Sequence, residues 1–284
     1  SGDSACSLPP YSLSEKIILE IKEATKKLAL GLEVKGLMNV QYAIKDDVLY
    51  VLEVNPRASR TVPFVAKATG IPVAKIASLI MVGRKLSEFN LVEKKLKHFA
   101  VKEVVFPFAR FSNADTLLGP EMKSTGEVMG LDKTFAMAFA KAQVAAGSKL
   151  PTSGLVFLSV KDSDKKYVVE LGQKLVDIGL KIVATRGTAK ILAENDIAVT
   201  IVNKITEEKP HVVDMIDRKE IALVINTSEG TQSIKDSLSI RRTSLMRGVT
   251  YTTTISGAQA LLAAIKAYKE AGSRFEVTAL QDLE

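Results

Sequence analysis

The sequence predicts an α/β protein in two parts, a partial α+β subdomain followed by a Rossmann-like domain with a parallel sheet. In the first half, two β-rich runs, 37–44 and 48–56, flank a short polar turn and predict a hairpin. In the second half, short apolar runs alternate with helix-length segments, which is typical of βαβ units. The length of 284 residues agrees with two domains. A stretch rich in Gly, Ser, Pro and Thr at 147–154 divides them into residues 1–147 and 148–284.

The first domain is expected to open with a loop over residues 1–10 and a helix after it. Ser12 and Glu15 have the spacing of a capping box, so we expect the helix to begin after Ser12. Gly31 or Gly36 is expected to end it. The remaining expected elements are helices at 62–69, 72–82 and 133–146, a strand at 101–107, and a connecting helix or loop at 84–100.

The second domain is expected to alternate strands and helices. The strands are expected at 154–160, 181–184, 198–202 and 221–226. The helices are expected at 164–178, 187–194, 210–219, 231–245 and 256–271.

Composition excludes several classes of protein. One cysteine, Cys6, excludes a disulfide framework, and two histidines make a His-rich metal site unexpected. The net charge of +7 is distributed over both halves without interleaved aromatic residues, so no nucleic acid partner is expected. The apolar runs are shorter than the roughly 18–20 residues that span a membrane, and no targeting segment opens the chain. We therefore expect a cytoplasmic protein without a membrane partner.

A first group of polar side chains follows the predicted hairpin. Glu53 and Asn55 are two residues apart on one strand and share a face, and Gln41 lies on the partner strand. If the register pairs 41 with 53, which needs a three-residue turn or a bulge, the three side chains converge. Such oxygen donors suit Mg²⁺ holding nucleotide phosphates, and Arg57 and Arg60 follow in a loop suited to phosphoryl oxygens. The alternative is that these residues form only the solvated face of the hairpin.

A second group lies where two predicted parallel strands end. Thr185, Gly187 and Thr188 lead from a strand into a helix and offer hydroxyl and backbone N–H groups to a phosphate. A second strand end follows at 225–230, and Lys165 and Lys204 could add positive charge. The alternative is that Thr188 caps a helix and Gly187 makes a turn.

Three segments carry a resemblance that is more specific than spacing. They read SGDSACSLPP at 1–10, LEVNPRASRTVPFV at 52–65 and LGPEMKSTGEVMG at 118–130. The second resembles the end of an ATP-grasp domain, and the first resembles the segment that precedes the hairpin in the same family. All three resemble the large subunit of carbamoyl-phosphate synthase. The match runs in order across nearly the whole chain. Residues 148–284 resemble the methylglyoxal-synthase-like domain that closes that subunit.

The resemblance implies part of an ATP-dependent, glutamine-hydrolysing ligase of pyrimidine and arginine biosynthesis, with carbamate phosphorylated by ATP. It implies Mg²⁺ or Mn²⁺ on Gln41, Glu53 and Asn55, ATP beside Ser1, Gln41 and Glu53, and catalytic roles for Arg57 and Arg60. K⁺ is a further cation that it allows. The implied partners are a glutaminase small subunit and the remainder of the large chain, with oligomers allowed. Only about 40 residues precede Gln41, so we expect the chain alone to be inactive and to bind Mg·ATP weakly.

The resemblance also implies two effector sites. UMP or IMP is the expected nucleotide effector, although Arg186 stands where the bacterial pattern has His. Its implied contacts are Ser159, Lys165, Thr185, Thr188, Lys204, Asn226 and Ser228. Ornithine is a further implied effector, at Asp3, Glu103, Tyr251 and Thr253.

Two other functions compete with this interpretation. One is a stand-alone regulatory nucleotide-binding protein. The other is a lyase that acts like methylglyoxal synthase, but that class has a Gly-Gly-Asp segment where this chain has residues 207–211, EEKPH. Without that aspartate, we expect no lyase activity.

Overall fold

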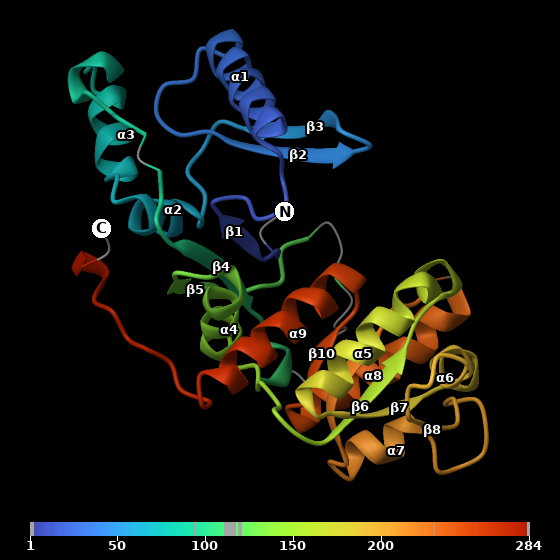
Figure 1. Ribbon diagram of the computed structural model, residues 1–284. Helices are drawn as coiled ribbons and strands as arrows, with labels where there is room; N and C mark the ends of the chain where they lie inside the picture. The colour runs from blue at the N-terminus through green and yellow to red at the C-terminus, as the bar shows by residue number, and fades with distance from the viewer. Residues whose placement is uncertain (1–2, 94, 111–117, 119–120, 230, 283–284) are drawn as a thin grey trace.

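The computed structural model describes residues 3–93, 95–110, 118, 121–229 and 231–282. Its described strands form a two-stranded hairpin, a three-stranded sheet and a five-stranded sheet. The hairpin and the three-stranded sheet lie in the first half of the chain, and the five-stranded sheet lies in the second half (Figure 1). The predicted α/β class with a parallel sheet in the second part is therefore confirmed.

The first helix, α1 (Glu15–Gly31), begins two residues later than a Ser12 cap would place it. Its N-cap is Ser14, whose hydroxyl oxygen accepts a hydrogen bond from the backbone N–H of Ile17 at 3.4 Å. Ser14 has the extended backbone that an N-cap requires, with φ −71° and ψ 154°. The prediction that Ser12 caps this helix was wrong, because Ser14 stands directly before the first helical residue.

The predicted hairpin is confirmed as β2 (Asn39–Lys45) and β3 (Val48–Asn55). Asp46 and Asp47 both have positive φ, 52° and 58°, and connect the paired residues Lys45 and Val48. Aspartate tolerates this backbone conformation better than most residues, so the turn has only two residues.

The three-stranded sheet is antiparallel, in the order β1-β4-β5. Of these three strands, only β4 (Phe99–Val105) overlaps a predicted strand, and it begins and ends two residues before the expected range, 101–107. Phe64 and Ala68 of the helix α2 pack on one face with Ala100 of β4. The helix α4 packs on the other face. The elements are β1 (Cys6–Leu8), α2 (Val62–Thr69), α3 (Val73–Met81), β4 (Phe99–Val105), β5 (Gly126–Asp132) and α4 (Phe135–Ala145), with 3₁₀ turns at Leu86–Phe89 (η1) and Phe108–Arg110 (η2).

The five-stranded sheet is parallel, in the order β10-β9-β6-β7-β8. One buried cluster joins one face of the sheet to α5, α6 and α9, and a second joins the other face to α7 and α8. The elements are β6 (Leu155–Ser159), α5 (Val168–Ile178), β7 (Lys181–Ala184), α6 (Arg186–Ala193), β8 (Val199–Ile201), α7 (Val212–Asp217), β9 (Ile221–Asn226), α8 (Thr231–Arg247), β10 (Thr250–Thr252) and α9 (Ile255–Glu270), with 3₁₀ turns at Asp162–Tyr167 (η3) and Leu280–Asp282 (η4).

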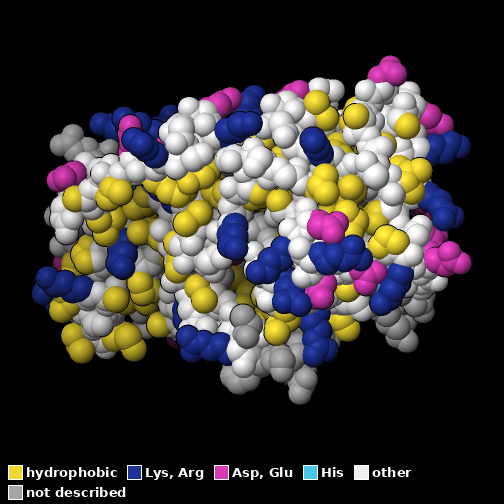
Figure 2. Space-filling view, turned by 90° about the horizontal axis from the view of Figure 1, so that it is seen from below, with side chains coloured by type: hydrophobic (Ala, Val, Ile, Leu, Met, Phe, Trp, Pro, Cys, Tyr) yellow, Lys and Arg dark blue, Asp and Glu magenta, His cyan; other side chains and the backbone are white. Residues whose placement is uncertain are grey.

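The two parts meet where α4 packs against α9 (Figure 1). The boundary at 147/148 stays a prediction, and it lies directly after α4, where Gly147 has a φ of 93°. No single helix of the described chain is long and apolar enough to cross a membrane, and the one pair that passes together, α2 and α3, is bent by 116°. On the face seen in Figure 2, Lys and Arg side chains are mixed with acidic and apolar ones.

Candidate functional site

Three oxygen-bearing side chains of the hairpin converge as the sequence predicted. Gln41 of β2 lies directly opposite Glu53 of β3, and the register shifts between Gln41 and Tyr42. The bulge, not a longer turn, therefore produces the pairing. The Nδ2 atom of Asn55 donates a hydrogen bond to Oε1 of Glu53 at 2.9 Å, so these two donors also lie side by side.

The donors occupy the hairpin face that is turned away from α1. The hydroxyl oxygen of Tyr42 lies 2.7 Å from that of Thr25 in α1, so Tyr42 faces this helix. Because side chains alternate along a strand, the neighbouring Gln41 faces the opposite side. One carboxylate with two amide oxygens is a donor set that Mg²⁺ uses together with phosphate oxygens and water, so these residues fit the metal.

The two arginines after β3 differ in surroundings. Arg57 is exposed, and its Nη1 atom donates to the carbonyl of Ala58 at 3.3 Å. Arg60 is partly buried, and its guanidinium donates to both the carbonyl and the hydroxyl oxygen of Ser124, at 3.0 and 2.5 Å. Arg60 is therefore held by a distant loop, whereas Arg57 is exposed to solvent.

Asp3 holds the loop that anchors Arg60. Its two carboxylate oxygens accept hydrogen bonds from the backbone N–H groups of Lys123 and Ser124, at 2.7 and 2.9 Å. Burial opposes ionisation, but these N–H groups, the Ser124 hydroxyl and the Arg60 charge together lower the pKa of Asp3 below its ordinary value.

A buried ion pair lies beneath the start of α2. Lys102 of β4 contacts Glu127 of β5 at 3.1 Å, with side chains only 4% and 10% exposed. The hydroxyl of Thr61, the residue after Arg60, donates to the same oxygen of Glu127 at 3.4 Å. The other oxygen of Glu127 is buried without a partner among the described residues. The pair therefore ties the three-stranded sheet to the segment that carries the arginines.

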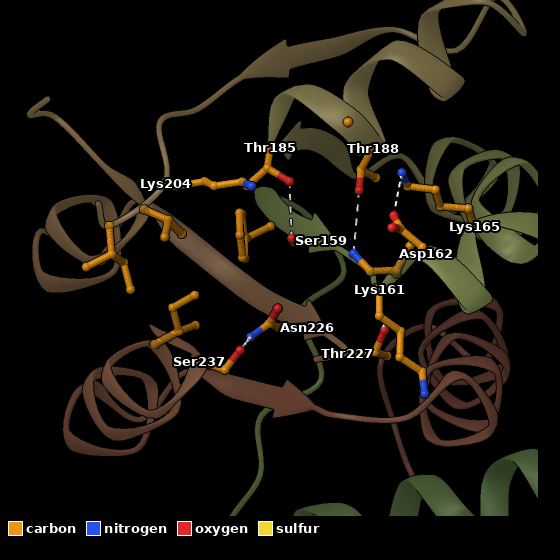
Figure 3. Close-up of a pocket in the computed structure, with 16 residues that line it drawn as sticks. Ser159, Lys161, Asp162, Lys165, Thr185, Thr188, Lys204, Asn226, Thr227 and Ser237 are labelled. Atoms are coloured by element: carbon orange, nitrogen blue, oxygen red, sulfur yellow. Dashed lines mark hydrogen bonds and ion pairs between the residues drawn. The ribbon is translucent and has the colours of Figure 1, made fainter. Parts of the chain in front are cut away.

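The second predicted group surrounds a cavity of about 370 Å³, named here the first pocket, where β6, β7 and β9 end. Figure 3 shows side chains from these strand ends and the following helices pointing into it. This is the edge where ligands bind in open α/β sheets. Six of the seven predicted effector contacts line it: Ser159, Lys165, Thr185, Thr188, Lys204 and Asn226.

The start of α6 gives the first pocket a positive region. The N–H groups of a helix's first turn have no partner within the helix. A Cβ atom added to Gly187 would lie 3.8 Å from Nζ of Lys165, so this ammonium group lies beside that turn. Lys165 also contacts Asp162 at 2.6 Å, and its hydrogen bond and charge lower the pKa of Asp162. The pocket therefore offers backbone donors and a cation to an anionic group.

Hydrogen bonds hold the polar side chains of the first pocket in place. The hydroxyl oxygens of Ser159 and Thr185 lie 3.1 Å apart, and the hydroxyl of Thr188 accepts from the backbone N–H of Val160 at 3.5 Å. Thr188 is only 2% exposed. The alternative that Thr188 merely caps a helix does not describe it, because the N-cap of α6 is Thr185.

Several lining residues were not predicted as effector contacts. Asn226 donates to the hydroxyl of Ser237 at 2.9 Å, which brings α8 into the site. Lys161 and Thr227 close one side, and apolar residues form the remaining wall. The polar residues directly after β6 and β9 were a usable signal, but Ser237 lies inside a helix eleven residues beyond Asn226. Gly187, which the sequence placed in the phosphate-binding turn, also lines the pocket. The unpredicted lining residues are Phe157, Val160, Lys161, Asp162, Ile205, Val212, Thr227, Ser237 and Ile240.

The residues predicted to contact ornithine are not brought together by hydrogen bonds. Within the described chain, none of Asp3, Glu103, Tyr251 and Thr253 is hydrogen-bonded to another of the four. Glu103 faces α4, where Gln143 donates to it, and burial raises its pKa. Burial also raises the pKa of Tyr251. Ser228 and Thr253 line a separate pocket. Ser1 lies outside the described residues.

The fold and the two sites define a class of protein, an ATP-binding segment joined to a methylglyoxal-synthase-like domain. Residues 1–89 match the family model described as "Carbamoyl-phosphate synthase L chain, ATP binding domain". Residues 167–253 match the "MGS-like domain".

The chain is a homologue of the carbamoyl phosphate synthase large chain over its whole length, and the resemblance is confirmed. It is 55% identical to the large chain of Rhizobium meliloti over 99% of its own length and 24% of the relative's. It is 53% identical to that of Pseudomonas syringae and 54% identical to that of Myxococcus xanthus, covering 26% of each. The chain thus spans about a quarter of the curated relatives it matches. Neither competing function is favoured by these similarities.

Proposed function

We propose that residues 1–147 are the end of an ATP-grasp unit that phosphorylates carbamate within a larger synthase. The observation that carries this proposal is the convergence of Gln41, Glu53 and Asn55 on the hairpin face opposite α1. These side chains would hold Mg²⁺ or Mn²⁺, which bridges the phosphates of ATP. Arg57 and Arg60 would neutralise phosphoryl oxygens during transfer.

The exposed hairpin supports the view that this part is incomplete by itself. Val48 and Tyr50 pair with Lys45 and Ala43, so they lie on the donor face, and each is 49% exposed. An apolar face beside a nucleotide site suits a covering segment from the remainder of the large chain. A glutaminase small subunit would supply ammonia, and we place the whole assembly in the cytoplasm. We expect the chain by itself to make no carbamoyl phosphate.

Substitution of Glu53 tests this proposal. In a complete large chain that ends in this sequence, E53Q should reduce carbamoyl phosphate synthesis from ammonia, bicarbonate and ATP by about 100-fold or more. The matched control is D47N in the hairpin turn, because asparagine tolerates the positive φ of 58° there. Equal activity of E53Q and D47N would contradict the assignment, as would synthesis by the 284-residue chain alone.

We propose further that residues 148–284 bind a nucleoside monophosphate, UMP or IMP, in the first pocket. The phosphate would bind at the start of α6 near Lys165 and Thr188, and the apolar wall with Phe157 and Ile240 suits a base. Ornithine remains a second proposed effector. Its support is the half-buried Glu103 carboxylate of β4, which faces α4, the helix that meets α9.

Calorimetry on the isolated chain tests the effector site directly. T188A should weaken UMP or IMP binding about tenfold through loss of a buried hydroxyl contact. T200A, which changes an exposed threonine of the same sheet, should bind like the parent chain. No heat with UMP, IMP, UTP or N-acetylglutamate would overturn the proposal. Release of methylglyoxal from dihydroxyacetone phosphate would instead support a lyase.

A further inference from the structure

A second pocket of about 350 Å³ lies beside the first, at the same edge of the parallel sheet. The loops after β6, β9 and β10 and the first turn of α9 line it, and Ser228, Thr253 and Ser256 are among its residues. Lys161 and Thr227 line both pockets and form the wall between them. The two pockets are therefore separate ligand volumes with one shared boundary.

The ammonium group of Lys161 belongs to the side of this wall that faces away from the first pocket. The backbone N–H of Lys161 donates to the hydroxyl of Thr227 at 3.1 Å, which fixes the wall. In Figure 3 the Lys161 side chain runs past Thr227 and away from Thr185 and Thr188. Its ion pair with Glu229 is long, 3.5 Å, and the Glu229 side chain is 67% exposed, so this pair holds the ammonium weakly.

The remaining lining is rich in hydroxyl groups. Thr227, Ser228, Thr253, Thr254 and Ser256 contribute them. Asp164 is the one carboxylate among the described lining residues, and Gln259 adds an amide. Thr227 and Thr254 already accept hydrogen bonds from the backbone N–H groups of Lys161 and Gly257. An apolar ligand would remove the other hydroxyl groups and the amide from water without replacing those hydrogen bonds, which is costly. A ligand with one anionic group for Lys161 and several hydroxyl groups for Asp164, the amide and the side-chain hydroxyls satisfies them.

We propose that the second pocket binds a small sugar phosphate, with its phosphate on Lys161. Only Lys161 and Thr227 are common to both linings, so the structure places Ser228 and Thr253, which were expected to contact the nucleotide and ornithine, in this separate pocket. One wall belongs to α9, which packs against α4 of the first part, so a ligand here contacts the helix that joins the two parts.

Amide NMR on the isolated chain, titrated with ribose 5-phosphate, tests this proposal. We expect saturable shifts of the Ser228, Ser256 and Gln259 amides. K161Q should weaken this binding about tenfold by removing the charged contact. The matched control K181Q, an exposed lysine at the opposite end of the sheet, should bind like the parent chain. Ribose without phosphate should shift these amides much less.

The variant T188A distinguishes binding in the first pocket from binding in the second. We expect T188A to weaken the nucleotide and to leave the ribose 5-phosphate shifts at Ser256 and Gln259 unchanged. Shifts confined to the surroundings of Thr185 and Thr188 would overturn the second site, as would equal binding by K161Q and K181Q. Failure of UMP and IMP to bind would overturn the nucleotide proposal alone. Unchanged spectra of K161Q away from the pocket show that the variant is folded.

Discussion

Replacement of Lys102 by methionine is expected to destabilise the first part of the protein strongly. Lys102 is buried, and its removal leaves the Glu127 carboxylate without a counter-charge in a site where its side chain is 10% exposed. One oxygen of Glu127 already has no partner among the described residues. The hydroxyl of Thr61 would remain as the described donor to this carboxylate.

The burial of the Lys102–Glu127 ion pair determines how much unfolding free energy K102M removes. Breaking a buried ion pair by removing one partner costs about 3–5 kcal/mol, because an uncompensated charge stays buried. The pair Lys22–Glu93 is the matched control, since it is shorter, 2.6 Å, but its side chains are 48% and 75% exposed. K22M should therefore cost no more than about 1 kcal/mol. The double variant K102M/E127L should recover most of the loss, because it removes both charges.

Native-state hydrogen exchange measures the loss of stability directly in the three-stranded sheet that contains Lys102. The amides of Val101 and Val104 lie in the buried strand β4, and their opening free energy reports the stability of the three-stranded sheet. The reasoning is refuted if K102M lowers that free energy no more than K22M does. It is also refuted if K102M/E127L is less stable than K102M alone.

Three further predictions concern other parts of the fold. G130A should cost at least about 1–3 kcal/mol in urea unfolding, because its Cβ would overlap the backbone of α4, whereas G126A on the same strand should be near neutral, since nothing lies within 4 Å. Burial raises the pKa of Glu103 above its ordinary 4.5, so its contribution to stability is present below pH 4.5 and lost as the pH rises through the folded pKa. E103Q should remove that part of the pH dependence, and an unchanged profile would contradict the assigned burial. N226A should cost about 1–2 kcal/mol in thermal unfolding through loss of the buried hydrogen bond to Ser237, and S237A combined with it should add little.

The elements that the sequence predicted correctly are those specified by neighbouring residues in the chain. The hairpin followed from two β-rich runs and a polar turn, and the conformation of Asp46 and Asp47 decided between a longer turn and a bulge. The strand β5 was missed because its sequence, GEVMGLD, has two glycines and little alternation. Gly130 is needed there because α4 packs against its backbone, which is a tertiary requirement that spacing does not reveal.

The residues of the candidate sites also divide into those that local sequence could place and those that only tertiary packing places. Residues at strand ends, such as Thr185 and Asn226, could be placed because the edge of a parallel sheet follows from the βαβ order. Ser237 could not, since its part in the site depends on how α8 crosses the sheet. The separation of Ser228 and Thr253 into another pocket depends on the wall that Lys161 and Thr227 form, which needs the packed loops to be seen.

The contacts of Asp3 have a practical consequence for handling the protein. Its carboxylate holds the backbone of the loop to which the Arg60 guanidinium is bound, so the position of Arg60 depends on the Asp3 side chain. Substitution of Asp3 by alanine should therefore release Arg60 and leave the parallel sheet intact. An affinity tag is better carried after α9, where Val277 is 93% exposed.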